Sequence, residues 1–85
     1  MPEAPLPEDP SQLPEQVKLR RLRRLVDTTA ALLRQANLTL GEALRLAELA
    51  RAEALRLFPD KAETYDLIYR PRFERLIRER FGDHV

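Results

Sequence analysis

The sequence predicts an all-α protein: a three-helix up-down-up bundle that follows a disordered, proline-rich N-terminal arm. The first observation is a composition of helix-forming residues, with 16 Leu, 13 Arg and 10 Ala among 85 residues. The second is that three stretches repeat apolar residues at the helical spacing of three and four. The third is that the turns between these stretches are short, which makes consecutive helices antiparallel neighbours.

Residues 1–13 are expected to form the disordered arm. Four of the first ten residues are proline, and acidic residues stand between them. Such a composition buries too little apolar surface to offset the entropy lost on ordering. The single helical domain is expected over 14–82, and 83–85 are expected to form a short tail.

The first helix is predicted over about 14–36. Pro14 suits the first helical position, where its missing N–H is not needed. Apolar residues at heptad positions form one face of this helix: Leu19, Leu22, Val26, Thr29, Leu33 and Ala36. Asn37 tolerates the left-handed conformation that often ends a helix, so the helix is expected to stop there.

The second helix is predicted over about 40–58. Thr39 and Glu42 have the spacing of a capping box, in which each side chain accepts a hydrogen bond from the other residue's backbone N–H. The centre of the apolar face is a stripe of small residues: Ala43, Ala47, Ala50 and Ala54. Alanine lets helix axes approach closely, and the wide apolar face predicts that this helix lies between two others.

The third helix is predicted over about 61–81. Pro59 ends the preceding helix, and Asp60 with Glu63 repeats the capping-box spacing. The apolar phase continues across Pro71, which favours one helix kinked at that proline over two independent helices. Gly82 is expected to cap its C-terminus.

The composition argues against several classes of function. The chain has no cysteine, and its one histidine is His84, so neither a disulfide, a metal site nor a histidine-based catalytic arrangement is expected. No phosphate-binding glycine motif or paired carboxylate arrangement is present, which predicts a protein that is not an enzyme and has no cofactor. No stretch is apolar enough to span a membrane, and a cytoplasmic location is expected. Arginine outnumbers lysine 13 to 2, a weak indication of a thermophilic source.

The predicted function is a protein-interaction or scaffold module, because a chain this short carries more apolar surface than three helices can cover. The simplest partner is a second copy, which would make a homodimer, and the alternative is a helix of another protein. The expected interface residues are Leu46, Leu49, Leu57, Phe58, Tyr65, Tyr69 and Phe73. Arg51 and Arg72 are expected to set the partner's orientation or to hold an anion, since guanidinium groups bind carboxylates and phosphates.

A different class of function remains open as the alternative. The net charge is only +1, yet residues 1–16 carry four acids and no base, while 17–36 carry six bases and one acid. The basic stretch contains an arginine cluster on the first helix: Arg20, Arg21, Arg23 and Arg24. Arginines on one helix face can contact phosphates, so this cluster indicates a possible nucleic-acid-associated protein.

Overall fold

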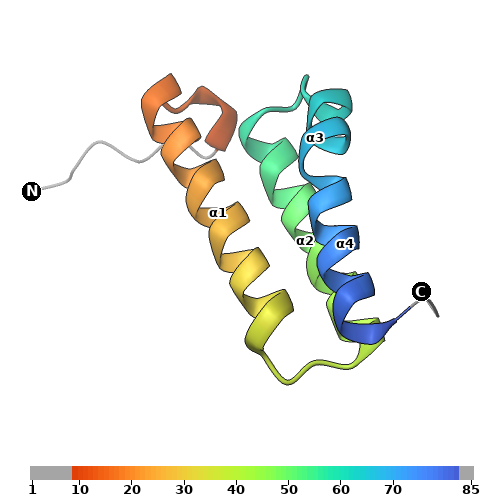
Figure 1. Cartoon of the computed structure of the whole chain (residues 1–85). Helices are drawn as coiled ribbons and strands as arrows, with labels where there is room; N and C mark the ends of the chain where they lie inside the picture. Colours follow the sequence, from red (N-terminus) through yellow and green to blue (C-terminus); the bar gives the residue numbers. More distant parts are fainter. Residues whose placement is uncertain (1–8, 83–85) are drawn as a thin grey trace, which may run out of the picture.

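The computed structural model describes residues 9–82 and confirms the all-α, three-helix bundle. Its elements in chain order are a short 3-10 helix η1 (Pro10–Gln12), then α1 (Glu15–Gln35), α2 (Leu40–Leu57), α3 (Ala62–Ile68) and α4 (Arg70–Phe81). Helices α1 and α2 form the first two rods, and α3 with α4 forms the third (Figure 1). Helix α1 packs against α2 and α4, whereas α3 packs against α2 and α4.

The structure describes the last five residues of the predicted arm, 9–13. The Asp9 carboxylate accepts hydrogen bonds from the backbone N–H of Ser11 at 3.0 Å and from its hydroxyl at 2.7 Å. The Lys18 ammonium donates to the Ser11 carbonyl at 3.1 Å, and η1 packs on α2. Residues 1–8 and the tail at 83–85 lie outside the described residues, and the disorder of the arm stays a prediction.

The turn between α1 and α2 confirms one cap and corrects another. Both hydrogen bonds of the Thr39–Glu42 capping box are present, at 2.9 and 3.1 Å. Among the described residues only Gly82 has a positive φ, so Asn37 does not adopt the predicted left-handed conformation. The Arg80 guanidinium of α4 instead donates to the carbonyl oxygens of Leu33 and Ala36, which supplies donors for the exposed carbonyls at the end of α1.

The third rod consists of two helical segments, and the residue between them, Tyr69, also has helical backbone angles (φ −99°, ψ −34°) and donates its N–H to the Tyr65 carbonyl, so the prediction of one helix kinked near Pro71 is not contradicted. Helix α3 ends at Ile68, Tyr69 joins the segments, and α4 starts one residue before Pro71. Proline has no N–H for the carbonyl four residues earlier, but it is tolerated in the first turn of a new helix. The predicted Asp60–Glu63 capping box is wrong, since α3 begins after Lys61 without a side-chain cap. Gly82 ends α4 at φ 81°, as predicted.

The core lies on the axis between the three rods. Its buried side chains come from all the α-helices: Val26, Thr29, Leu33, Ala43, Ala50, Ala54, Leu57, Tyr65, Phe73 and Ile77. Three of the four residues of the predicted alanine stripe are among them, so these small side chains of α2 face the core, and each of the three rods contacts the other two. The apolar face of α1 is buried from Val26 onwards but is open at its N-terminal end, where Leu19 is 49% exposed.

Candidate functional site: a cavity and a basic furrow along the first helix

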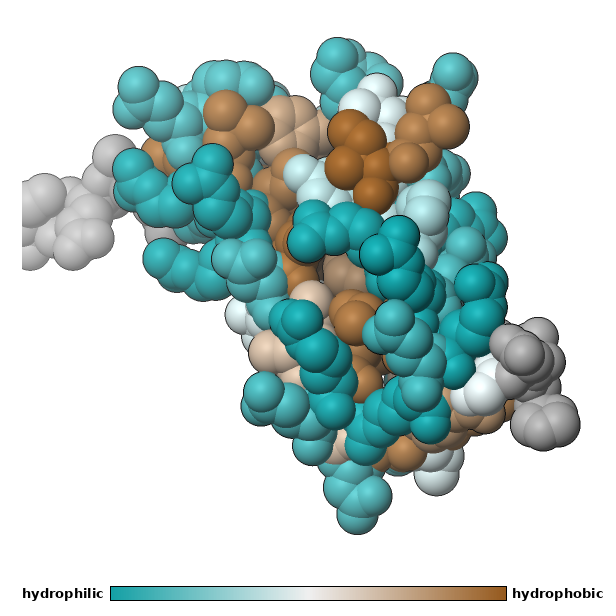
Figure 2. All heavy atoms as spheres, in the orientation of Figure 1, coloured by the Kyte–Doolittle hydropathy of each residue, from teal (hydrophilic) through white to brown (hydrophobic). Residues whose placement is uncertain are grey.

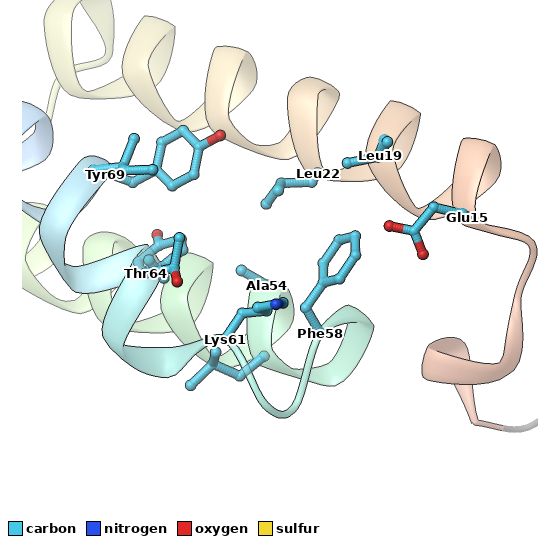
Figure 3. A pocket seen from close by; sticks show the side chains of 11 residues that line it. Glu15, Leu19, Leu22, Ala54, Phe58, Lys61, Thr64 and Tyr69 are labelled. Atoms are coloured by element: carbon cyan, nitrogen blue, oxygen red, sulfur yellow. The ribbon is translucent and has the colours of Figure 1, made fainter.

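An apolar cavity of about 210 Å³ opens between the start of α1, the end of α2 and α3. Helix α1 contributes Leu19 and Leu22, and the residue after α2 contributes Phe58. Ile68, the last residue of α3, and Tyr69, at the α3–α4 junction, line the opposite side of the cavity. Figure 3 shows Leu19 and Leu22 on α1, across the cavity from Phe58 and Lys61, with Tyr69 further along the cavity.

The cavity exists because the apolar face of α1 extends further than the helices that cover it. Leu19 and Ile68 both line the cavity, and they are 49% and 50% exposed. Leu67, the neighbour of Ile68 on α3, is 73% exposed and is the most exposed large apolar residue in the described part of the chain. Apolar surface thus remains uncovered at the end of the bundle that holds α3.

Tyr65 lies between this cavity and a second hollow on the α2–α4 side, and lines both. Its side chain is buried, and its hydroxyl has no hydrogen-bond partner among the described residues. The rings of Tyr65 and Tyr69 stand with centroids 5.3 Å apart at 44°. Burial, opposed weakly by the nearby Arg51 charge, raises the pKa of Tyr65 to about 12.

Beyond the cavity, a furrow runs between α1 and α4. Two hollows form this furrow. The nearer hollow shares Leu19, Leu22 and Tyr69 with the cavity. The farther hollow shares Val26 and Arg72 with the nearer one. Four arginines line these two hollows: Arg23, Arg34, Arg72 and Arg75. Figure 2 shows hydrophilic side chains on both sides of this furrow, over an apolar floor. We call this surface the arginine furrow.

The predicted arginine cluster of the first helix is divided between different hollows. Arg21 and Arg24 line a different hollow, between α1 and α2, where Glu53 is also present. Arg23 alone joins the arginine furrow, and Arg20 is exposed but lines none of these hollows. At about 100° per residue the four arginines span roughly 160° of the first helix, as the sequence predicted, but the hollows beside α2 and α4 each receive different members of the cluster.

Arg51 and Arg72, predicted to act together, lie in different grooves. Arg51 forms a two-bonded ion pair with Asp66 across α2 and α3, with nitrogen–oxygen distances of 2.8 and 3.0 Å. The hydrogen bond from Arg51 lowers the pKa of the Asp66 carboxyl, and that pairing raises the pKa of Arg51. Arg72 instead lines the α1–α4 furrow. The Arg51 guanidinium is therefore already paired with a carboxylate of the same chain, whereas Arg72 lines an open hollow.

Some of the predicted interface residues are buried in the core, and the others are at least partly exposed. Leu57, Tyr65 and Phe73 are 5%, 5% and 3% exposed and belong to the core, so the chain itself covers these three side chains. They are too buried to anchor a partner, because the bundle rotates the aromatic face of the third rod towards its axis. Leu46, Phe58 and Tyr69 are half-buried, and Leu49 is 60% exposed.

Several residues of the site were not singled out from the sequence. Leu19 was assigned to the bundle face, and neither Arg34 nor Arg75 was among the predicted site residues. No sequence signal pairs Arg34 with Arg75, because their neighbourhood depends on how α1 and α4 are rotated against each other.

The chain gives no match to protein-family models, to curated proteins or to solved structures. Within residues 9–82 no group of three or more carboxylate or histidine side chains is arranged to hold a metal ion. In the same part of the chain no helix is both long and apolar enough to cross a bilayer.

Proposed function

We propose that the protein is an interaction module that works as a homodimer, with the cavity of one copy receiving Leu67 of the other. The observation that carries the proposal is the cavity of about 210 Å³, open to solvent and lined mainly by apolar side chains. Contiguous apolar surface of this kind usually marks an interface, because its exposure to water is unfavourable.

A second copy of the chain is favoured as the occupant because α3 carries both an exposed leucine and residues that line the cavity. Leu67 is 73% exposed, while its neighbour Ile68 and Tyr65 line the cavity. A two-fold interface places one surface patch against its own copy, so it requires a patch that is complementary to itself. A projecting leucine beside an apolar cavity meets that requirement.

The cavity rim carries one acidic and one basic residue, so the rims of two copies can attract each other. These residues are Glu15 and Lys61, and both are exposed. Within the chain Glu15 approaches Lys18 at 3.8 Å, while Lys61 has no ion pair among the described residues. A two-fold axis through the cavity region brings the acid of one copy towards the base of the other, which helps orientation more than affinity.

The test is the mass of the full chain in solution, measured by sedimentation equilibrium at physiological salt and at about 1 M salt, where the screening length is about 3 Å. The expected result is a dimer that persists at both salt concentrations, because apolar burial is not screened. Leu67→Glu is expected to weaken dimerisation at least about tenfold, since burying an unpaired charge costs more than the ~1.4 kcal/mol of one tenfold step.

Leu49→Glu is the matched control. Leu49, an interface residue in the sequence-based prediction, is also highly exposed but does not line the cavity, so the pair of variants separates the two candidate interfaces. Leu49→Glu is expected to leave the dimer unchanged, and circular dichroism should show the same helix content in both variants. A monomer at all accessible concentrations would contradict the proposal. A dimer that Leu49→Glu dissociates and Leu67→Glu does not would contradict the cavity as the interface.

A further inference from the structure

The arginine furrow gathers four positive charges that the chain does not neutralise by contact. Arg23 and Arg34 come from α1, and Arg72 and Arg75 from α4. All four side chains are exposed, and none forms an ion pair or a side-chain hydrogen bond with another residue in 9–82. The acids of the same hollows are Asp27 and Glu79, which leaves a local excess of two positive charges.

The furrow has the shape for one extended chain. Its arginines stand on both walls, and the floor between them includes the apolar residues Val26, Ala30 and Leu76. Arg23 and Arg34 are 11 residues apart on α1, which corresponds to about 16 Å along the helix axis. Neighbouring packed helices stand roughly 8–10 Å apart, so the furrow is a shallow groove between them, and we expect one strand to lie along it more readily than a duplex.

We propose that the arginine furrow binds the phosphate backbone of a single-stranded nucleic acid. Guanidinium groups on both walls suit a ligand that carries a charge at every backbone unit. The planes of the same groups and the apolar floor offer surfaces on which unpaired bases can stack. A purely acidic peptide such as poly-glutamate also carries a charge at every unit but has no flat rings to place on such a floor, so the observations favour the nucleic acid.

The site does not depend on the homodimer. Its four arginines are all outside the cavity lining, and the furrow only meets the cavity at Leu19, Leu22 and Tyr69. Binding to the furrow and self-association can therefore be measured separately, and each can fail without the other.

The experiment is fluorescence anisotropy of a labelled oligothymidylate of about 12 nucleotides, titrated with the full chain at about 50 and about 200 mM salt. If four phosphates are neutralised, the logarithm of affinity falls with the logarithm of salt with a slope of about −2.8, or about 50-fold over this range. A duplex of the same length and a poly-glutamate peptide serve as competitors, and both are expected to compete much more weakly than unlabelled oligothymidylate.

The decisive variant is Arg72→Gln with Arg75→Gln, which removes one wall of the furrow. Its salt slope is expected to fall to about −1.4, or about 7-fold over the same range. The matched control is Arg45→Gln with Arg78→Gln, which changes the net charge equally at exposed residues that line neither hollow of the furrow. The control is expected to keep most of the parent slope.

Three outcomes would overturn the proposal. One is no binding of oligothymidylate at about 50 mM salt. Another is an equal loss in the control and in the furrow variant, which would mean that only the net charge matters. The third is competition by poly-glutamate or by the duplex as strong as that of the unlabelled oligonucleotide, which would assign the furrow to another class of ligand.

Discussion

Replacing Tyr65 by phenylalanine is expected to stabilise the protein, because the change removes a buried hydroxyl without a hydrogen-bond partner in the described part of the chain. The ring is 5% exposed and remains in the core, so little changes besides the oxygen atom. A buried polar group left unpaired costs about 1–3 kcal/mol, and we expect a gain of about 1 kcal/mol. For a domain of this size the melting temperature then rises by about 4–8 °C, which circular dichroism at neutral pH measures.

The same substitution has a pH dependence whose sign follows from the raised pKa. In the unfolded chain the Tyr65 hydroxyl ionises near its ordinary pKa of 10.0, whereas burial in the folded protein raises that pKa to about 12. The contribution of the neutral Tyr65 hydroxyl to the free energy of unfolding is therefore fully present below pH 10 and is lost as the pH rises through 12. Because this contribution of the folded-state hydroxyl disappears between the two pKa values, the stability advantage of Tyr65→Phe should grow by up to roughly 3 kcal/mol over this range in urea unfolding.

Tyr69→Phe is the control, since it removes a hydroxyl from a half-buried tyrosine that stacks against the same ring. The reasoning is refuted if Tyr65→Phe is less stable than the parent chain at neutral pH, because the hydroxyl must then have a partner. It is also refuted if the difference between variant and parent stays constant from pH 10 to pH 12.

Three further substitutions test the contacts that end the helices. Arg80→Gln is expected to lower the free energy of unfolding by about 2 kcal/mol in urea denaturation, since charged donors are lost from the carbonyls of Leu33 and Ala36; an unchanged midpoint would mean that water replaces them fully. Thr39→Ala is expected to cost about 1 kcal/mol and to speed amide exchange in the first turn of α2, whereas slow exchange there would contradict the capping role. Gly82→Ala is expected to cost about 1 kcal/mol because of its φ of 81°, and equal thermal stability would show that the end of α4 adjusts freely.

The helices could be predicted from the sequence because their signals are local. The Thr39–Glu42 capping box, the alanines of α2 and the glycine after α4 each act through residues a few positions away. The predicted left-handed Asn37 was wrong for a reason that is not local: Arg80, 44 residues from Ala36, supplies the donors at that helix end. The third rod was predicted as one helix kinked at Pro71, and its regular helix is interrupted only at Tyr69; the exact form of the interruption is not a local signal, because Pro71 is compatible with a kink and with the first turn of a new helix.

The candidate site was predictable only in outline. That apolar surface remains uncovered followed from the length of the chain, but the residues that carry it did not. Tyr65 and Phe73 were expected at the surface and are in the core, while Leu19 was expected in the bundle and lines an open cavity. Periodicity shows which residues share a face of one helix, and it does not show how far the next helix covers that face.

The sequence by itself determined that this chain folds as three amphipathic rods, because backbone hydrogen bonds and the 3.6-residue repeat are satisfied within each stretch. The tertiary structure alone decided which arginines share a surface and where apolar side chains stay open to solvent. Arg23 and Arg72 are 49 positions apart in the chain and line the same hollow. Their proximity depends on the rotation of α1 against α4, and that rotation is set by how the core side chains interlock.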